Sequence, residues 1–343
     1  MKISLITPYF HGERTLDKLL SPLRSLDPDQ RSQLEWIIVD DGSYDYSYQE
    51  LEQKTEPISE VRIIRLDKNH GPSYARNMGI EHARGEYFIF MDSDIHLTPS
   101  DFKTLIENKL DVIKNKETSI FTAGLHAQSI SREKSIFTRY KTDYMNAIFA
   151  PYKGQRLPCS FLYGSLCGWN KALEFRWPDS LRFGEDTYLA QHIISQDYSI
   201  TFFGDLTLHH AKTYNFTALL LNDFKIPYNF ALAYEDFKEA RSRNKKFSHV
   251  SSWQLAAIAL SAPLLFINIW PLSLSLLFIF LWSIANRPLY PYILKDRSVD
   301  KKVLNIILTL IDQWVMGMGI FFGLIHARFF DHQSQKRLRS LKH

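Results

Sequence analysis

Two carboxylates stand where a strongly apolar run ends. The stretch Phe88–Leu97 reads FIFMDSDIHL, so a predicted buried strand leads directly into Asp92 and Asp94. Two residues apart on an extended chain, these side chains would lie on the same side. Their repulsion is costly unless hydrogen-bond donors or a cation offset it, and Mg²⁺ or Mn²⁺ held together with substrate phosphates would do so. Taken alone, the triplet more often opens a loop and caps the next helix.

Polar residues also follow other predicted strands. Asp40 and Asp41 stand in VDDGS, where Gly42 permits a tight turn, and a plain turn explains them about equally well. HGPSYARNMG places Arg76 near a predicted helix start, where a guanidinium could meet phosphate oxygens, although a surface salt bridge is the commoner role. Because parallel sheets collect ligands at the carboxyl ends of their strands, we expect these side chains at one edge of a sheet.

A second acidic pair, Glu185 and Asp186, lies in RFGEDTYLAQHI. A hydroxyl group is a poor nucleophile at neutral pH and gains from a carboxylate that takes its proton as the new bond forms. Asp186 could instead be the N-terminal cap of a helix predicted at Thr187–Ile194, and the two roles can coexist. An aspartate at a helix start is expected to stay ionised, which a general base requires.

The elements around these residues alternate between strands and helices. The predicted strands are Lys2–Tyr9, Leu34–Asp40, Val61–Leu66 and Tyr87–Asp92, and the predicted helices lie near Thr15–Leu26, Tyr46–Glu56 and Ser73–Ala83. This rhythm predicts an α/β fold with a mainly parallel sheet. Strands that are apolar on both faces indicate that helices cover both sides. The chain has no GxGxxG or GxxxxGK[ST] string, which disfavours a dinucleotide fold and a P-loop.

The pattern after Leu97 is more mixed. Further elements are predicted as a helix near Pro99–Asn115, a strand near Ser119–Ala123, a helical segment near Phe137–Tyr152 and a strand Ser199–Gly204 that leads to Leu206–His210.

Taken together and in this order, four strings resemble the family 2 glycosyltransferases of the GT-A fold: ITPYFHGERTL, IIVDDGSYD, NHGPSYARNMGIEHARGEYFIFMDSD and FGEDTYLA. The resemblance covers about Lys2–His210. It implies a Rossmann-like, nucleotide-sugar-binding domain with a mainly parallel sheet. It also implies an enzyme that transfers a sugar from a nucleotide-diphosphate donor with inversion, using Mn²⁺ or Mg²⁺.

The same resemblance implies roles for individual residues. Those expected to bind the nucleotide sugar are Thr7, Pro8, Tyr9, Glu13, Asp40, Asp41, Arg76, Asp92, Ser93 and Gly164. The first four would line the nucleotide pocket, Asp40 or Asp41 would hydrogen-bond the base, and Arg76 would approach the diphosphate. Gly164 stands where the family forms the floor of its sugar and acceptor site, although a plain turn fits it equally well.

For the metal and the chemistry, the resemblance singles out five positions. Asp94 would bind the divalent cation directly, with Asp92 close to both the cation and the ribose. His209 is a further candidate ligand, although a hydrogen-bonded structural histidine is the commoner outcome. Asp186, beside Glu185, would act as the catalytic base.

The sequence departs from the family pattern at two places. The family often has Asn-Glu after its first tyrosine, whereas this chain reads YFHGE, so the role of Glu13 depends on the loop length. The QxxRW string of the processive polysaccharide synthases is absent, and Arg176-Trp177 precedes GED rather than following it. These features argue against processive synthesis.

The acceptor class follows from whether a base is needed. A polyprenyl phosphate is already an anion and needs none, whereas an alcohol does, so the GED string favours a hydroxyl of a lipid-linked saccharide. Transfer to polyprenyl phosphate is the alternative within the family. A catalytically silent GT-A membrane scaffold is the alternative outside it.

The charge pattern changes near residue 240. Val250–Asn286 contains no Asp, Glu, Lys or Arg, and a second apolar stretch, Val303–Phe330, contains Asp312 and His326. As one helix the first stretch would be on the order of 55 Å long, far beyond a hydrocarbon core of about 30 Å. We expect instead two short helices broken at Asn268–Pro271. Either the second stretch lies in the membrane interface, or the first stretch makes one kinked crossing and the second returns, so the topology stays open.

These patterns predict two parts: a catalytic domain, residues 1–240, with a nucleotide-binding half, 1–95, and an acceptor half, 96–240, followed by a membrane-associated helical tail, 241–343. Basic residues flank the tail: Arg241, Arg243, Lys245, Lys246, Lys336, Arg337, Arg339 and Lys342. They suit an anionic cytoplasmic membrane face. Because nucleotide sugars are made in the cytoplasm, we expect the catalytic domain on that face of a bacterial inner membrane.

Composition sets further bounds. The formal net charge is only +4, from 41 Lys plus Arg against 37 Asp plus Glu, so nucleic acid is not an expected partner. Two cysteines, Cys159 and Cys167, are predicted to be small buried thiols. The start MKISLITPYF has no long apolar core, and we predict no signal peptide and a reducing surrounding for the first domain. The family resemblance and the apolar tail together imply the expected partners. These are a nucleotide-sugar donor, a saccharide or glycolipid acceptor and membrane lipid.

Overall fold

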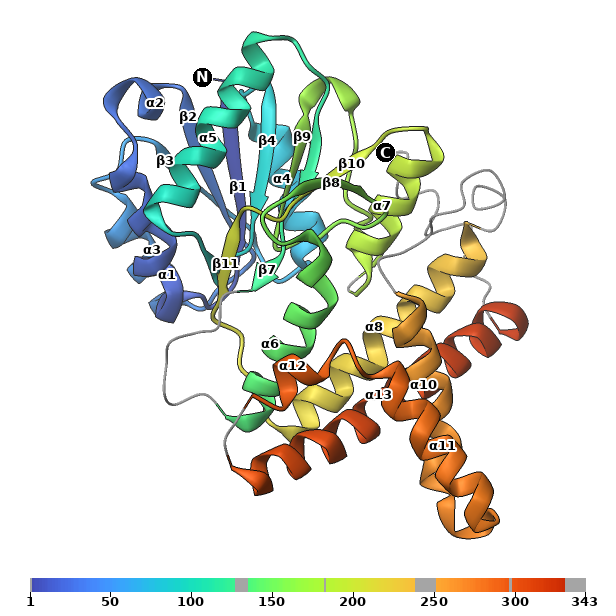
Figure 1. Cartoon of the computed structure of the whole chain (residues 1–343). Helices are drawn as coiled ribbons and strands as arrows, with labels where there is room; N and C mark the ends of the chain where they lie inside the picture. Colours follow the sequence, from blue (N-terminus) through green and yellow to red (C-terminus); the bar gives the residue numbers. More distant parts are fainter. Residues whose placement is uncertain (1, 127–134, 182, 238–250, 296–297, 331–343) are drawn as a thin grey trace.

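An eight-stranded sheet forms the centre of the N-terminal part in this computed structural model, which describes residues 2–126, 135–181, 183–237, 251–295 and 298–330 (Figure 1). In sheet order the strands are β3 (Val61–Arg65), β2 (Leu34–Asp40), β1 (Ile3–Tyr9), β4 (Tyr87–Met91), β9 (Leu166–Asn170), β6 (Ile120–Thr122), β10 (Ile200–Phe203) and β8 (Arg156–Cys159).

Most of these strands run in the same direction. β3, β2, β1 and β4 are parallel, as are β6 and β10, whereas β9 is antiparallel to β4 and β6, and β8 is antiparallel to β10. The predicted α/β fold with a mainly parallel sheet is therefore confirmed. The strand order reverses between β1 and β4, and ligands of open α/β sheets bind outside the carboxyl ends of the strands at such a reversal.

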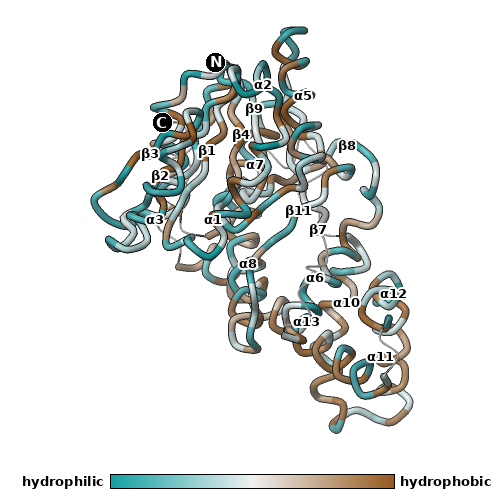
Figure 2. The backbone as a smooth tube through the Cα atoms, turned by 90° about the vertical axis from the view of Figure 1, so that its left-hand side faces the viewer, coloured by the Kyte–Doolittle hydropathy of each residue, from teal (hydrophilic) through white to brown (hydrophobic). Residues whose placement is uncertain are grey.

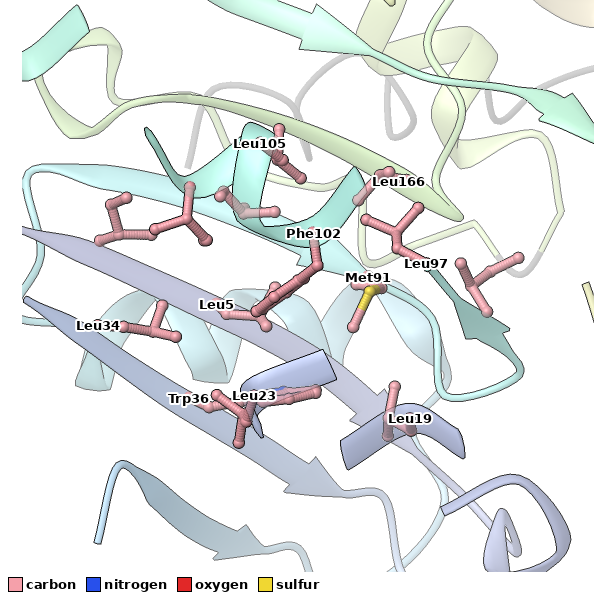
Figure 3. Packing of buried hydrophobic residues seen from close by; sticks show 14 of the residues in the cluster. Leu5, Leu19, Leu23, Leu34, Trp36, Met91, Leu97, Phe102, Leu105 and Leu166 are labelled. Carbon is pink, nitrogen blue, oxygen red and sulfur yellow. The ribbon is translucent and has the colours of Figure 1, made fainter. Parts of the chain in front are cut away.

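Helices cover both faces of the sheet. Alternate residues of β1 point to opposite faces: Leu5 packs in one apolar cluster and Ile6 in another. The first cluster is completed by α1 (Glu13–Leu20), α3 (Asp45–Thr55) and α5 (Pro99–Lys114). Figure 3 shows Leu19 of α1 and Phe102 of α5 in this cluster with Trp36 of β2. The second is completed by α4 (Pro72–His82) and α7 (Glu185–Ser195). This packing fixes the loops that follow the strands.

Several predicted helix limits shift locally. The helix expected near Thr15–Leu26 splits into α1 and a 3₁₀ turn, Ser21–Ser25, where Pro22 cannot donate a helical hydrogen bond. A short helix, α2 (Pro28–Ser32), follows with a capping box at Asp27 and Gln30. The helical segment expected near Phe137–Tyr152 is α6 (Ile136–Phe149) followed by one 3₁₀ turn, Ala150–Tyr152.

A small second sheet extends the carboxyl edge of β4. It contains β5 (Ile95–His96), β11 (Thr207–His210) and β7 (Leu125–His126), with β11 in the middle. Because β11 pairs with β5 directly after the DSD triplet, a segment more than a hundred residues later is brought beside Asp94.

The C-terminal part is helical and hydrophobic (Figure 2). Its elements are α8 (Phe216–Asp236), α10 (Ser252–Leu265), a 3₁₀ turn (Ile267–Ile269), α11 (Leu272–Ala285), α12 (Tyr290–Ile293) and α13 (Val299–Phe329). The predicted break at Asn268–Pro271 is confirmed, since α10 and α11 form a hairpin around it. Among the described residues α13, with 31 residues, is the one helix long and apolar enough to cross a membrane by length and composition.

Sequence reasoning missed α8. This helix continues from the small sheet, packs along α13 and carries Leu232 and Ala233 into the cluster that contains α7. The catalytic part and the tail are thus joined by an extensive helix pair. The basic flanks named above lie outside the described residues.

Candidate active site

The DSD triplet follows β4 directly, as predicted, and each of its carboxylates has a basic neighbour. The Asp92 carboxylate accepts a hydrogen bond of 2.6 Å from Nη2 of Arg76. The Asp94 carboxylate lies 3.1 Å from Nε2 of His210. Ser93, between them, is held by its carbonyl, which accepts a 2.8 Å hydrogen bond from Thr15 of α1. The repulsion between the two aspartates is thus offset from two sides.

The pKa values of the two aspartates shift in opposite directions. Burial raises the pKa of Asp92 despite the charge of Arg76 and with a contribution from the negative charge of Asp94. Burial also opposes ionisation of Asp94, but the hydrogen bond and charge of His210, with help from Lys212, outweigh it and lower the pKa of Asp94. Asp94 is therefore the more readily ionised carboxylate of the pair.

Arg76 connects the DSD triplet to the GED string. Its Nη2 contacts Asp92 and, at 3.3 Å, the carbonyl oxygen of Gly164, and its Nη1 lies 3.4 Å from Oε1 of Glu185. The guanidinium carbon is 4.3 Å from the ring centre of Trp177, and the side chain is only 2% exposed. The surface salt bridge considered for Arg76 is therefore wrong. Its approach to a diphosphate stays a prediction.

The acidic pair lies at the first turn of α7. The helix begins at Glu185, and its N-cap is Gly184, whose φ of 76° suits glycine. Asp186 accepts a 2.7 Å hydrogen bond from the N–H of Thr187. Asp186 is thus inside the first turn, and the cap role considered for it falls to Gly184.

Burial dominates the protonation of this pair. It raises the pKa of Glu185 to about 7, with a further increase from the charge of Asp186 and an opposing effect of Arg76. Burial also raises the pKa of Asp186, against the N–H of Thr187 and the charge of Arg76. We expected the helix start to keep Asp186 ionised, but the cost of desolvating its carboxylate is larger than that effect.

The structure brings His210, rather than the predicted His209, to Asp94. Neighbouring residues of a strand point to opposite faces, and in β11 the ring of His209 stacks on His96 instead, with ring centres 4.8 Å apart. The sequence signal for His210 was the same HH pair, but the choice between its members depends on the register of β11 with β5.

A divalent cation fits this place only with ligands from a substrate. The described residues contain no group of three or more His, Cys, Asp or Glu side chains that could hold a metal. They do place one carboxylate, Asp94, beside one imidazole, His210. Both are donors that Mn²⁺ accepts, and two protein donors completed by phosphates and water are usual for Mg²⁺ and Mn²⁺ at nucleotide sites.

The residues expected to line the nucleotide pocket lie near the carboxyl ends of β1 and β2. Several of them form hydrogen bonds with other side chains of the protein. Thr7 accepts a 2.9 Å hydrogen bond from the indole of Trp36. The Tyr9 hydroxyl lies 3.2 Å from Ser47, whose hydroxyl donates to Glu13 at 2.7 Å. Pro8 is half-buried. The part that these residues play in lining a nucleotide pocket stays a prediction.

The two aspartates of VDDGS have different surroundings. Asp41 accepts hydrogen bonds of 2.8 Å from the N–H groups of His70 and Gly71, and so fixes the loop before α4. Asp40 accepts one from Ser43 at 3.2 Å, and its Oδ2, 3.8 Å from Nε of Arg65, accepts no hydrogen bond from the described residues. Of the two, Asp40 has the oxygen that accepts no such hydrogen bond, and that oxygen is fully buried beside Arg65.

Three aromatic rings at the same edge were not singled out from the sequence. The ring of His11 lies 4.3 Å from that of Phe10 and 4.5 Å from that of Tyr44, measured between ring centres. Phe10 and Tyr44 are both exposed, and His11 has a positive φ of 49°. Exposed rings beside the carboxyl ends of β1 and β2 offer a stacking surface for a planar base. The FHG string and Tyr44 were its only sequence signals.

A family model described as glycosyl transferase family 2 matches residues 4–121, which include β1, the DDGS loop, Arg76 and the DSD triplet. This region belongs to glycosyltransferase family 2. The predicted resemblance is thus confirmed. The GED string and the helical tail lie outside the residues that the family match covers.

Curated relatives match less than half of the chain. The undecaprenyl-phosphate 4-deoxy-4-formamido-L-arabinose transferase of Shewanella sediminis is 29% identical over 43% of this chain and 42% of its own length. The poly(ribitol-phosphate) beta-N-acetylglucosaminyltransferase TarS of Staphylococcus aureus is 29% identical over 39% of this chain and 24% of its own length. The chain thus spans less than half the length of the curated relatives it matches.

A solved structure extends the likeness in fold. The mannosyltransferase PcManGT from Pyrobaculum calidifontis, in complex with GDP-Man and Mn²⁺, superposes with a TM-score of 0.53 and 16% identity, covering 96% of this chain and 87% of that one. The predicted GT-A fold is confirmed for the family 2 domain.

Proposed function

We propose that this chain is an inverting, metal-dependent glycosyltransferase. It would transfer a sugar from a nucleotide-diphosphate donor to a hydroxyl of a lipid-linked saccharide in cell-surface glycan synthesis. The observation that carries the proposal is the position of Arg76, which contacts Asp92 on the donor side and Glu185 beside the proposed base. Two acidic strings far apart in the sequence thus meet at one edge of the sheet.

The donor would lie across the reversal between β1 and β4. Its base would stack near Tyr44 and hydrogen-bond to Asp40, and its diphosphate would face Asp94 and His210. Mn²⁺ or Mg²⁺ held there would offset the charge that develops on the departing nucleoside diphosphate. Arg76 would keep Asp92 and Glu185 fixed beside it.

The acceptor would enter from the GED side. Asp186 would take the proton of the acceptor hydroxyl while that oxygen attacks the anomeric carbon and the bond to the diphosphate breaks. Attack opposite to the leaving group inverts the anomeric configuration. The raised pKa of Asp186 suits proton transfer near neutral pH, because a base whose pKa is far below the working pH accepts protons poorly.

The names of the relatives point to two classes of acceptor. One names undecaprenyl phosphate and another names poly(ribitol-phosphate). A phosphate acceptor needs no base, so the buried GED pair favours a hydroxyl. Transfer to polyprenyl phosphate is the second candidate, and the relative named for undecaprenyl phosphate is the observation that supports it.

The tail would associate with membrane lipid and hold the catalytic part on the cytoplasmic face of a bacterial inner membrane. Its outer surface is apolar: Phe266, Ile269, Leu272, Phe280 and Phe321 are all exposed. A contiguous apolar surface of this kind marks a membrane or protein interface. The α13 helix is the one candidate span among the described residues.

The proposal is tested by incubating the purified full chain with a panel of nucleotide sugars and with lipid-linked saccharides and polyprenyl phosphate as separate acceptors. Each reaction is run with Mn²⁺, with Mg²⁺ and with excess chelator. We expect transfer to a saccharide hydroxyl that the chelator abolishes and Mn²⁺ restores. Metal-independent transfer would refute the metal role, and transfer to polyprenyl phosphate alone would refute the hydroxyl acceptor. Absence of donor binding across the panel would favour a silent scaffold.

A further inference from the structure

The helix α13 has a polar side and an apolar side, and the structure buries the polar one. Its buried residues include Asn305, Thr309, Asp312 and Gln313, spaced three or four apart along one face. Residues on the other side, including Phe321 and others such as Val303, Ile307 and Phe329, are exposed and apolar. A helix that crosses a bilayer by itself meets lipid all round, whereas an interfacial helix has one apolar face.

The buried side of α13 contacts the catalytic part over most of its length. Near its start Leu308 packs in the cluster formed by α6, and in its middle Asp312 accepts a 3.0 Å hydrogen bond from Tyr140 of α6. Near its end Ala327 packs against the cluster that contains α7. From Leu308 to Ala327 the helix rises by about 28 Å at 1.5 Å per residue. The contacts with the catalytic part thus continue along α13 for nearly the thickness of a hydrocarbon core, about 30 Å.

The helix α8, which lies between α13 and the sheet, is attached at both ends to the catalytic part (Figure 1). Just before its start, the N–H of Tyr214 donates to Thr138 at 2.8 Å. At its end, Asp236 accepts a 2.5 Å hydrogen bond from Tyr188 of α7. With 21 residues, α8 is about 31 Å long. It therefore lies along the catalytic part rather than pointing away from it.

Close packing binds α13 to this attached helix. A side-chain carbon added at Gly319 would overlap the carbonyl oxygen of Phe224, and one added at Gly323 would lie 2.5 Å from that of Tyr228. Glycines four residues apart let two helices approach closely, as in helix pairs within membranes. Because α8 lies along the catalytic part and α13 packs closely along α8, α13 also runs alongside the catalytic part.

The hairpin of α10 and α11 is too short to cross. Each helix has 14 residues, about 21 Å, against a hydrocarbon core of about 30 Å. Its turn is apolar, with Ile269 and Leu272 exposed. Polar groups near the turn are satisfied within the hairpin: Trp270 donates to the carbonyl of Pro263 at 3.1 Å, and Ser275 to that of Ile267 at 3.2 Å. Internal pairing of this kind is required of a turn surrounded by lipid.

We infer that the tail inserts into one leaflet and does not cross the membrane. The hairpin dips into the lipid and returns, α13 lies in the interface beneath α8, and both ends of α13 are on the side of the active site. The partner of this surface is the acyl-chain region of the leaflet that faces the catalytic part. This inference rests on the membrane association in the proposed function and specifies its geometry.

The active site would then lie directly above the lipid surface. A side-chain carbon added at Gly184 would be 2.8 Å from Cβ of Asn229 on α8, so the GED turn rests on the helix that covers α13. An acceptor anchored in the same leaflet could reach Asp186 without leaving the membrane.

Cysteine labelling in membrane vesicles tests the inference. Single cysteines are placed by Asp300→Cys and Arg328→Cys at the two ends of α13 and by Ile269→Cys at the hairpin turn. The background is Cys159→Ser, and the buried Cys167 is retained. Ser59→Cys, on the exposed surface of the catalytic part, reports which side that part occupies. Right-side-out and inside-out vesicles are treated with a membrane-impermeant maleimide.

We expect Asp300→Cys and Arg328→Cys to be labelled in the same vesicle orientation as Ser59→Cys. Ile269→Cys should resist the impermeant reagent in both orientations and react after detergent solubilisation. Labelling of the two α13 positions from opposite sides would overturn the inference, as would labelling of Ile269→Cys from the side opposite to Ser59→Cys. Either result would leave membrane association intact. Recovery of the chain in the soluble fraction would instead refute membrane association, and this inference with it.

Discussion

At the scale of single residues, the active-site proposal depends on four charged side chains that share one buried region: Arg76, Asp92, Glu185 and Asp186. Arg76 is nearly inaccessible and lies between Asp92 and Glu185. Burial and the neighbouring carboxylates have opposite effects on its charge, and the carboxylates prevail, so the pKa of Arg76 is raised. Removing either sign of charge would leave the other buried and unpaired.

The base assignment predicts a large kinetic effect of Asp186→Asn. The amide cannot accept the acceptor's proton, so kcat should fall by about 10²–10⁴-fold, the usual contribution of a general base. The KM for the donor should stay nearly unchanged. Asp197→Asn, the same change at the other, exposed end of α7, is the matched control and should keep activity. Near-normal turnover of Asp186→Asn at saturating substrates would show that this aspartate is not the base.

The acidic pair predicts a particular pH dependence. Because the base must be ionised, activity should rise with pH through a limb near the raised pKa of the pair, for which Glu185 has a value of about 7. Glu185→Gln removes one negative charge, which makes ionisation of Asp186 easier and should move the limb to lower pH. The measurement is kcat against pH with saturating Mn²⁺. An unchanged limb would mean that the two carboxylates do not interact.

The same raised pKa affects stability. Folded Glu185 holds its proton more tightly than the unfolded chain does, so its contribution to the free energy of unfolding is most favourable below its ordinary pKa of 4.5 and is lost as pH rises towards about 7. The Arg76 partner reduces this loss.

Arg76→Lys tests whether the geometry of the guanidinium matters. Lysine keeps the charge but cannot bridge Asp92 and Glu185 with a planar fork. We expect a lower kcat and a loss of stability of about 1–3 kcal/mol, the cost of leaving a buried hydrogen-bonding group without its partner. Arg84→Lys, on the exposed end of the next loop, is the control for the substitution itself. Calorimetry and donor kinetics give the two readouts, and wild-type values in both would remove Arg76 from the positioning role.

At the scale of elements, the position of α13 depends on close packing against α8. Alanine substitutions at two glycines of this helix distinguish the effect of close packing from that of helix propensity. A side-chain carbon at Gly319 would overlap the Phe224 carbonyl oxygen, whereas at Gly317 its nearest neighbour would be the Ile258 methyl carbon at 3.3 Å. Both changes to alanine favour helix formation equally.

We therefore predict that Gly319→Ala destabilises the chain by about 1–3 kcal/mol, the usual cost of overpacking. Gly317→Ala should be neutral or slightly stabilising. Thermal unfolding in detergent measures both. Equal effects of the two substitutions would show that α8 and α13 do not pack as closely as described.

At the scale of the whole molecule, the candidate active site and the C-terminal helices are joined by continuous packing. Two apolar clusters connect the sheet to the tail, and residues of α6, α8 and α13 share buried polar contacts such as Lys141 with Asp223, at 2.5 Å. If the tail enters the leaflet as inferred, this connection would keep the GED turn at a fixed height above it.

This arrangement predicts surface dilution. With a lipid-linked acceptor, activity should fall as detergent or inert lipid is added at constant bulk acceptor concentration, because enzyme and acceptor meet in two dimensions. A water-soluble analogue of the acceptor saccharide should show no such fall. Equal behaviour of both acceptors would argue against delivery from the membrane surface.

The sequence by itself determined the family, the α/β order of the first hundred residues, the position of the DSD and GED strings and the apolar hairpin. These depend on local spacing, strand periodicity and charge patterns, which a single chain displays directly. Asp92 and Asp94 could be placed at a strand end because the run before them is continuously apolar.

The tertiary structure decided what depends on register and burial. Whether His209 or His210 meets Asp94 is fixed by the pairing of β11 with β5, since a shift of one residue exchanges the faces of the strand. The raised pKa of Asp186 comes from desolvation by residues distant in the sequence. The course of α13 along α8 and α6 was also undetermined, because the apolar pattern of one segment does not show which elements it packs against.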